Sequence, residues 1–168
     1  MMMKRAAAAL SFAVLVASPV LAHGNPRGTT KVVFAGKAVA IEYGRPALGG
    51  RDMLAKAPVG TVWRLGADAP TTLATETALS FGPVVVPKGD YTLTATRTAE
   101  DTWTLNVEKR DPAAPRSPGT KIAEVTLAPS TLPESVELLT IELSAEKGTG
   151  VFAMTWGTTA MKATFTAR

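Results

Sequence analysis

Threonines alternate with apolar residues along much of the chain, and this two-residue period constrains the fold more than any other feature. The segment YTLTATR (91–97) places its apolar residues on one side of an extended chain and its threonines on the other. The segment TWTLNVEK (102–109) repeats the pattern, with Asn106 and Glu108 expected on the exposed side. Such alternation is typical of strands with one buried face. The residues TAED between the two segments suit a hairpin turn.

The rest of the sequence contains further short stretches of strand type, separated by linkers that mostly carry Gly, Pro or Asp. The predicted strands are Lys31–Phe34, Ala38–Tyr43, Val62–Leu65, Thr71–Glu76, Val84–Val86, Ile122–Leu127, Val136–Leu143, Gly150–Trp156 and Ala160–Phe165. Together they predict an all-β fold, an antiparallel β-sandwich of Greek-key or jelly-roll type with about ten short strands. At most one short helical turn is expected, in RDMLAKA (51–57), where Asp52 would cap it.

The phrase VPKGDYTL favours the sandwich on separate grounds. Pro87 and Gly89 are turn residues, and the strand that follows carries Tyr91. In Greek-key sandwiches a tyrosine at such a corner bonds through its phenol to a nearby backbone group. We therefore expect Tyr91 to bond across this turn.

The N-terminus has the three parts of a secretory signal peptide. Lys4 and Arg5 are followed by the apolar run Ala6–Ala17 and by small residues up to Ala22. The run has 12 residues, short of the roughly 20 that span a bilayer as a helix. We expect cleavage near Ala22, a single domain over residues 23–168, a periplasmic or secreted location, and no membrane span after the leader is removed.

Composition excludes several classes of function. Without Lys4 and Arg5 the formal net charge falls from +4 to +2. The sequence has no stripe of Lys and Arg of the kind that would predict nucleic-acid binding. The chain has no cysteine, so disulfides and thiol chemistry are excluded. Its single histidine, His23, lies at the expected terminus, where a catalytic triad is not expected. The sequence predicts no cofactor and no metal site.

The stretch between Tyr43 and Asp68 concentrates arginines and glycines in a chain otherwise rich in Thr, Val, Ala and Leu. In one interpretation its arginines bond to Glu42, Asp52, Asp68 and loop carbonyls, and so fix an irregular segment. In another they line a ligand site at one end of the sandwich, where loops carry function. Guanidinium groups match carboxylates and phosphates, and aromatic faces stack on rings. The candidate ligand-binding residues are Tyr43, Arg45, Arg51, Asp52, Trp63, Arg64, Asp68 and Thr71.

The same stretch carries a family resemblance. EYGRPALGGRDMLAKAPVGTVWRLGADAPTTLATE, continued by VPKGDYTLTA and TWTLNVE, resembles the exported bacterial proteins of domain-of-unknown-function family 2911. Members share Y-G-R-P, a following G-R, W-R-x-G-A-N and a later P-x-G-x-Y, and the likeness covers about Lys31 to Glu108. Asp68 stands where the family usually has Asn, so a role needing an amide donor there is in question. The resemblance implies export and a β-rich single domain, and it implies no activity.

The sequence therefore predicts an exported binding or structural protein, with an anionic or sugar-like small ligand or an envelope component as its partner. The alternative is a carboxylate-dependent hydrolase acting on a sugar or anionic envelope substrate, with Glu42, Asp52, Asp68 and Glu76 as candidate acids. The catalytic residues of such an enzyme are not identified by the sequence, which favours binding over catalysis.

Overall fold

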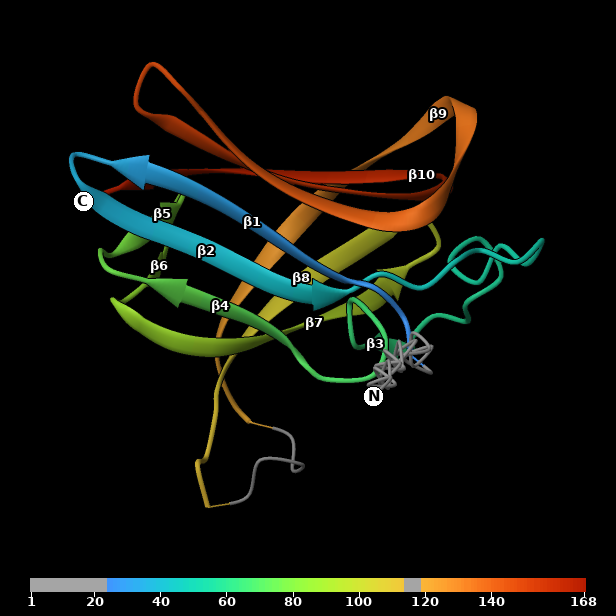
Figure 1. The fold of residues 1–168 in the computed structure, drawn as a ribbon, viewed down its shortest axis with the longest axis horizontal. Coiled ribbons are helices and arrows are strands. Elements are labelled where there is room, and N and C mark those ends of the chain that lie inside the picture. The colour runs from blue at the N-terminus through green and yellow to red at the C-terminus, as the bar shows by residue number, and fades with distance from the viewer. Residues whose placement is uncertain (1–23, 114–118) are drawn as a thin grey trace, which may run out of the picture.

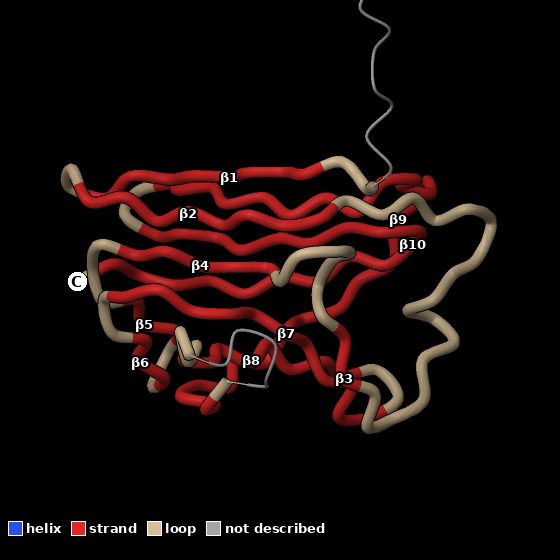
Figure 2. Tube along the Cα trace, turned by 60° about the horizontal axis from the view of Figure 1, so that its bottom comes forward, coloured by secondary structure: helices blue, strands red, loops and turns tan. Residues whose placement is uncertain are grey.

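The structure of the chain is a computed structural model that describes residues 24–113 and 119–168. The predicted leader and His23 lie outside the described residues. The described part contains ten strands and no helix: β1 (Arg27–Phe34), β2 (Lys37–Gly44), β3 (Val62–Trp63), β4 (Thr71–Thr75), β5 (Leu79–Phe81), β6 (Val84–Val86), β7 (Gly89–Ala99), β8 (Thr102–Lys109), β9 (Thr120–Glu146) and β10 (Thr149–Ala167). Figures 1 and 2 show their arrangement.

All pairings between these strands are antiparallel, and they join the strands into one sheet. The order is β1-β2-β4-β7-β8-β9-β10-β5-β6, with β3 added beside β7. The long strand β9 joins two parts of the sheet: the part that runs from β1 to β8, and the part formed by β10, β5 and β6. The first residues of β9 pair with β8, and its later residues pair with β10. The predicted all-β antiparallel class is confirmed, as one open sheet; the Greek-key or jelly-roll description stays a prediction.

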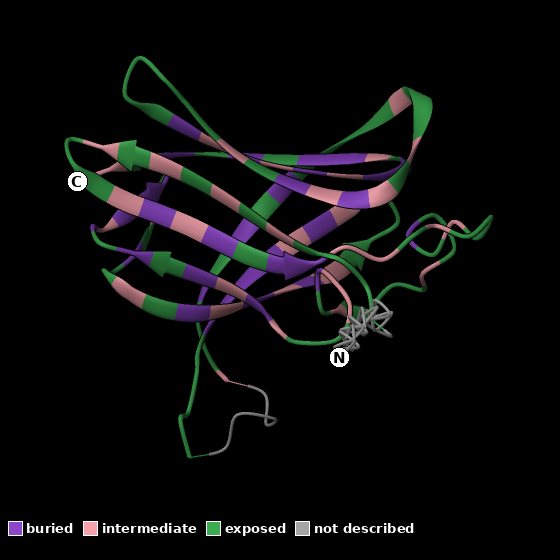
Figure 3. Cartoon of the chain, viewed as in Figure 1, coloured by how far each residue is buried: buried purple, intermediate pink, exposed green. Residues whose placement is uncertain are grey.

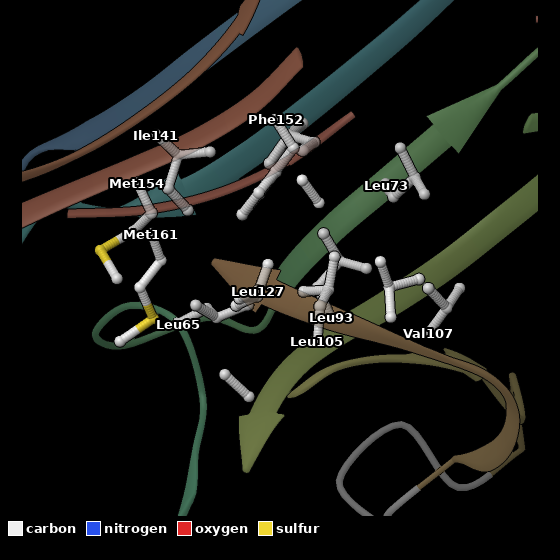
Figure 4. Close-up of a cluster of buried hydrophobic side chains, with 14 of the residues drawn as sticks. Leu65, Leu73, Leu93, Leu105, Val107, Leu127, Ile141, Phe152, Met154 and Met161 are labelled. Carbon is white, nitrogen blue, oxygen red and sulfur yellow. The ribbon is translucent and has the colours of Figure 1, made fainter. Parts of the chain in front are cut away.

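The core lies between the two parts of this sheet, and the period-2 alternation explains it. Tyr91, Leu93 and Ala95 of β7 are buried, as are the alternate residues of β8. Figure 3 shows the resulting bands of buried and exposed residues along the strands. Figure 4 shows leucines from β7, β8 and β9 gathered near Phe152 and Met154 of β10. Burial of such side chains contributes about 1.5–3 kcal/mol each.

A small cavity remains inside this core. Its free volume is about 10 Å³, and its lining is entirely apolar and includes Ile41, Leu73, Phe152 and Phe165. That volume is about the size of one water molecule. The interior here is therefore filled by side chains of the protein itself.

Several strand boundaries differ from the prediction. Each of the two longest strands, β9 and β10, was predicted as two separate strands, and β5 was not predicted at all. In β10 the apparent break is Gly157, where the pairing with β9 shifts register and the glycine has a φ of 60°. A bulge of this kind bends a strand without ending it.

The expected exposure of Asn106 and Glu108 is wrong, because only 1% and 9% of their surfaces are accessible. The Asn106 amide nitrogen donates to the hydroxyls of Thr94 and Thr96, at 3.0 and 2.9 Å. The Thr94 hydroxyl in turn donates to Glu108 Oε1 at 2.9 Å. Since β8 lies between β7 and β9, neighbouring strands cover these side chains and supply their hydrogen bonds.

Two local predictions are confirmed in their contacts. The Tyr91 hydroxyl donates to the carbonyl of Pro87 at 2.8 Å, which is the bond expected of a tyrosine corner. Asp52 Oδ1 accepts from the amide of Ala55 at 2.9 Å, so Asp52 caps a turn, although the segment RDMLAKA forms no helix. Within the described residues, no helix is long and apolar enough to cross a membrane.

Candidate functional site

The Y-G-R-P segment lies along an edge of β9 where, among the described residues, a single antiparallel bridge between Ala47 and Leu138 takes the place of a paired strand. The Tyr43 hydroxyl donates to the Ile141 carbonyl at 3.1 Å and accepts from the Ile141 amide at 2.9 Å. Arg45 Nε donates to the carbonyl of Leu139 at 3.1 Å, and the Leu139 amide donates to the carbonyl of Pro46 at 3.0 Å. Side chains here take the place of a strand ladder, because backbone groups away from water need partners.

Two further contacts extend this row in both directions along β9. The amide of Leu143 donates to the Thr30 hydroxyl at 2.8 Å, and the amide of Leu48 donates to the carbonyl of Glu137 at 2.8 Å. We call this row the closing seam. It comprises Thr30, Tyr43, Arg45, Pro46 and Leu48 on one side and residues 137–143 of β9 on the other. The seam joins β1 and β2 to β9, and Figure 1 shows β1 lying between β2 and β9.

Gly28 of β1 leaves the path by which Tyr43 and Arg45 reach β9. A Cβ atom at Gly28 would lie 2.7 Å from the Tyr43 ring and 2.9 Å from Arg45 Cδ. Distances that short are steric clashes. The two side chains therefore cross the edge strand β1 where it has no side chain of its own.

The Y-G-R-P and W-R-L-G-A-D segments meet through their glycines. A Cβ atom at Gly44 would lie 2.0 Å from the carbonyl oxygen of Ala67, and one at Gly66 would lie 2.9 Å from the carbonyl oxygen of Gly44. The Thr71 hydroxyl donates to the carbonyl of Leu65 at 2.8 Å, and Leu65 has φ at 54°. These contacts fix the turn after β3 directly against the end of β2.

Asp68 and Arg64 complete that turn at the surface. Arg64 Nη2 donates to the backbone carbonyl of Asp68 at 2.6 Å. Asp68 Oδ2 accepts from the amide and the side chain of Asn25, at 2.9 and 3.2 Å. The Asp68 carboxylate thus accepts hydrogen bonds from the residues just before β1, a contact that uses its capacity as an acceptor.

Residues 47–61, which we call the strap, cross from the closing seam to β3. Gly49 begins the crossing by donating its amide to Glu137 Oε1 at 3.0 Å. Asp52 Oδ2 lies close to Gly157 of β10, at 3.2 Å from the position of a Cβ atom there. Leu54 inserts its side chain into the core, with 4% of its surface exposed. Figures 1 and 2 show the strap extending beyond the ends of the strands.

Arg97 of β7 holds the far end of the strap. Its guanidinium group donates to the carbonyls of Ala55, at 3.3 Å, and of Ala57. It also donates to the carbonyl of Glu100 in the β7–β8 turn. The Gly60 amide donates to the Arg97 carbonyl at 2.7 Å. Sequence reasoning missed Arg97, because it sits in a strand far from the glycine-rich stretch.

All three tryptophans of the chain pack together beneath the strap's end. Trp63 of β3 stacks on Trp156 of β10 with ring centroids 5.7 Å apart and planes 8° apart. The Trp63 and Trp103 rings meet edge to face at 6.4 Å. Trp63 remains half-buried, and the buried Trp156 Nε1 has no hydrogen-bond partner among the described residues. The stack fixes β3 and therefore the position of the residues on either side of it.

The structure separates the eight predicted site residues into two groups. Tyr43, Arg45, Asp52, Asp68 and Thr71 make the backbone or packing contacts described above. Arg51 and Arg64 have exposed side chains, and Trp63 is half-buried. The arginines do not meet in one pocket: Arg45 binds β9, and Arg64 binds its own turn. The interpretation in which the arginines fix the loop named carboxylates and loop carbonyls as their partners. Among the described contacts, Arg45 and Arg64 donate to carbonyls and to the Thr140 hydroxyl, and none joins these arginines to the carboxylates of Glu42, Asp52 or Asp68.

The described residues contain no group of three or more His, Cys, Asp or Glu side chains placed to hold a metal ion. Glu42 faces Arg27, with Oε2 3.9 Å from Nη2. Glu76 Oε2 accepts from the amide of Ala38 at 2.7 Å. The four candidate acids thus have four different sets of partners: Arg27 for Glu42, Ala55 for Asp52, Asn25 for Asp68 and Ala38 for Glu76.

These contacts define an all-β protein built on one open antiparallel sheet, in which a glycine-rich segment is fastened across the edge of β9. The chain belongs to the family described as Protein of unknown function (DUF2911), whose model matches residues 25–165. Searches among curated proteins and among solved structures find no match. The resemblance seen in the sequence is confirmed, and the match extends well past Glu108 to include β9 and most of β10.

Proposed function

We propose that the protein is an exported binding module of the cell envelope, and that it binds its partner through the exposed side chains of the strap, of β3 and of Arg64, which directly follows β3. The supporting observation is that some residues of this segment hold it in place while others have exposed side chains. Tyr43 and Arg45 fasten the segment to the seam, while Arg51 is exposed and Arg64 is exposed with one bond, to the Asp68 carbonyl. Exposed guanidinium groups on a fastened loop suit the recognition of an anionic partner.

The fastening favours binding because it reduces the entropy lost on association. The strap is held at Gly49 by Glu137, at Ala55 and Ala57 by Arg97, and in its middle by the buried Leu54. Trp63 is held by its stack on Trp156. The exposed side chains are thus presented from a backbone with many fixed points.

The hydrolase alternative has less support than binding. A glycosidase needs two carboxyl groups about 5–10 Å apart, one of them a proton donor. Here Asp52 is engaged with the strap and Asp68 with Asn25. No contact in the described residues brings two of the candidate acids together.

The experiment is a binding measurement by calorimetry and thermal shift with a panel of soluble anions, including inorganic phosphate, citrate and an acidic oligosaccharide. The variant Arg51→Gln/Arg64→Gln is compared with Lys37→Gln/Lys162→Gln, which removes the same charge from exposed positions on other strands. We expect at least one anion to bind the wild type and the control, and to bind the arginine variant at least about tenfold more weakly, since charge-assisted bonds contribute roughly 1.5–3 kcal/mol. Equal affinity in the two variants would refute the proposed site.

A further inference from the structure

The strap and β3 expose the three most accessible large apolar side chains of the described residues. Met53 and Val59 are each 59% exposed and Val62 is 61% exposed. The other exposed large apolar residues, Val33, Val85 and Ile122, lie on three separate strands. Single exposed apolar residues are ordinary. Here three of them lie within ten residues of the sequence, two in the strap and one at the start of β3.

Basic side chains are interleaved with these apolar ones. Arg51, Lys56 and Arg64 are exposed, and they alternate along the chain with Met53, Val59 and Val62. The only acid between residues 47 and 64 is Asp52, which is partly buried and accepts from Ala55. The exposed charged side chains of residues 47–64 are therefore all basic, and the two carboxylates that contact this stretch, those of Asp52 and Glu137, accept hydrogen bonds from its backbone amides.

The position of the segment makes this surface available to a flat partner. Figures 1 and 2 show it extending past the ends of the strands, away from the sheet. Its ends are fastened by the closing seam and by Arg97. A large planar surface can therefore reach the strap without displacing any strand.

A soluble anion would use the basic groups alone and would leave Met53 and Val59 in water. A layer of anionic lipid uses both kinds of group, because basic side chains bind the headgroups while apolar ones enter the boundary below them. Each Lys or Arg close to an anionic leaflet strengthens binding about fivefold. Resting on the binding role proposed above, we infer that the strap, β3 and the adjacent Arg64 form a membrane-contact surface that docks on anionic phospholipid headgroups.

The test is co-sedimentation of the full-length chain with vesicles of phosphatidylglycerol and phosphatidylcholine, and with vesicles of phosphatidylcholine alone. Three variants are compared with the wild type: Met53→Ser/Val59→Ser, Arg51→Gln/Lys56→Gln/Arg64→Gln, and the control Val33→Ser/Val85→Ser. Residues 6–17 are apolar themselves, so every comparison is made within the same full chain, in which their contribution is constant.

We expect the wild type and the control to bind the anionic vesicles, with weaker binding to phosphatidylcholine alone. The basic-residue variant should lose about a hundredfold in partition coefficient, and the Met53/Val59 variant about tenfold. Raising the salt from about 0.1 M to 1 M should weaken the wild type strongly, because screening shortens the range of the charges.

The outcomes also distinguish this inference from the proposed function. Binding to a soluble anion through Arg51 and Arg64, with no difference between anionic and neutral vesicles, would overturn the membrane surface and leave the binding role standing. Vesicle binding that is unchanged in both strap variants would also overturn it. Loss of vesicle binding in the basic variant only, with full binding retained by Met53→Ser/Val59→Ser, would contradict insertion of the apolar residues and so the inference as stated.

Discussion

The Tyr43 hydroxyl occupies both hydrogen-bonding groups of Ile141, a residue 98 positions away in the chain. Tyr43 and Ile141 are both buried, with 4% and 1% of their surfaces exposed. A strand would normally fill these two backbone groups with two separate bonds. Here one phenol does so from β2, across the edge strand β1. The seam therefore depends on hydrogen bonds from buried side chains, and water cannot easily take their place if those side chains are removed.

Replacing Tyr43 by Phe should destabilise the protein by about 2 kcal/mol, because the amide and carbonyl of Ile141 would both stay buried without partners. Chemical denaturation monitored by circular dichroism measures the loss. The change removes one oxygen and keeps the ring, so packing against Gly28 is retained. A loss below about 0.5 kcal/mol would contradict the role of the seam, since that is within the usual range for surface changes.

Gly44 should tolerate no side chain, because its backbone passes directly beside Ala67. Gly44→Ala is expected to cost about 3 kcal/mol or more, through a clash with a carbonyl oxygen that cannot rotate away. The matched control is Gly49→Ala in the strap. Gly49 has a φ of 58° and no atom near the position of a Cβ, so only the roughly 1 kcal/mol of left-handed strain applies. Equal losses in the two variants, measured by thermal unfolding, would contradict the steric contact with Ala67 as the reason for a glycine at position 44.

How far the sequence could predict this fold depends on whether the signal is local. The alternation in β7 and β8 lies within single segments, so their pairing and inward faces could be predicted. β5 could not, because all three of its residues, including Ser80, are buried and the segment has no alternation. The sequence predicts two strands in place of β9, because Pro129 and Pro133 resemble strand breaks. Both prolines lie within β9. A strand tolerates proline at a sheet edge or where its pairing is irregular.

The site was less predictable than the fold because its contacts are long-range. Spacing marked Tyr43 and Arg45 as unusual, yet their partners on β9 lie more than 90 residues away. Arg97 carries no local signal, since it occupies the position of one more polar residue in an alternating strand. The sequence singled out the segment between Tyr43 and Asp68. It could not show which arginines fasten that segment and which remain exposed.

Arg45 and Arg51 should differ sharply in their effect on stability. Arg45 is partly buried and donates to the Leu139 carbonyl and the Thr140 hydroxyl, so Arg45→Ala should cost about 2 kcal/mol. Arg51 is exposed, and Arg51→Ala should change the free energy of unfolding by less than about 0.5 kcal/mol. Thermal unfolding of the two variants side by side measures the difference. A large loss in Arg51→Ala would mean that Arg51 fastens the strap, and would weaken its proposed binding role.

Stability should fall at high pH through Tyr91. Burial, with a smaller contribution from the negative charge of Asp90, raises the pKa of the Tyr91 phenol above its ordinary value of 10.0. The folded state thus favours the neutral phenol. This contribution is complete below about pH 10, the pKa of an unfolded tyrosine, and is lost as the pH rises through the higher folded pKa.

The measurement compares the wild type with Tyr91→Phe over a range of pH. At neutral pH the variant should be less stable by about 1 kcal/mol, because the hydrogen bond to the Pro87 carbonyl is lost. Above about pH 10 the difference should shrink, since only the wild type carries this phenol. The comparison isolates this phenol, because the two proteins differ at residue 91 alone. A difference that stays constant up to about pH 11 would argue against the raised pKa.

Arg97 should control the strap more than the global fold, since its guanidinium group bonds to carbonyls of Ala55 and Ala57. Arg97→Gln removes most of these bonds at once, and a single amide cannot reach all the carbonyls. We expect trypsin to cleave after Arg51 and Lys56 at least about tenfold faster, because charge-assisted bonds worth roughly 1.5–3 kcal/mol no longer hold the strap closed. The control is Arg64→Gln, which loses only the bond to the Asp68 carbonyl and should leave those two cleavage rates nearly unchanged. Equal acceleration in both variants would indicate general loosening of the protein, and unchanged cleavage in Arg97→Gln would mean that the seam and Leu54 hold the strap without it.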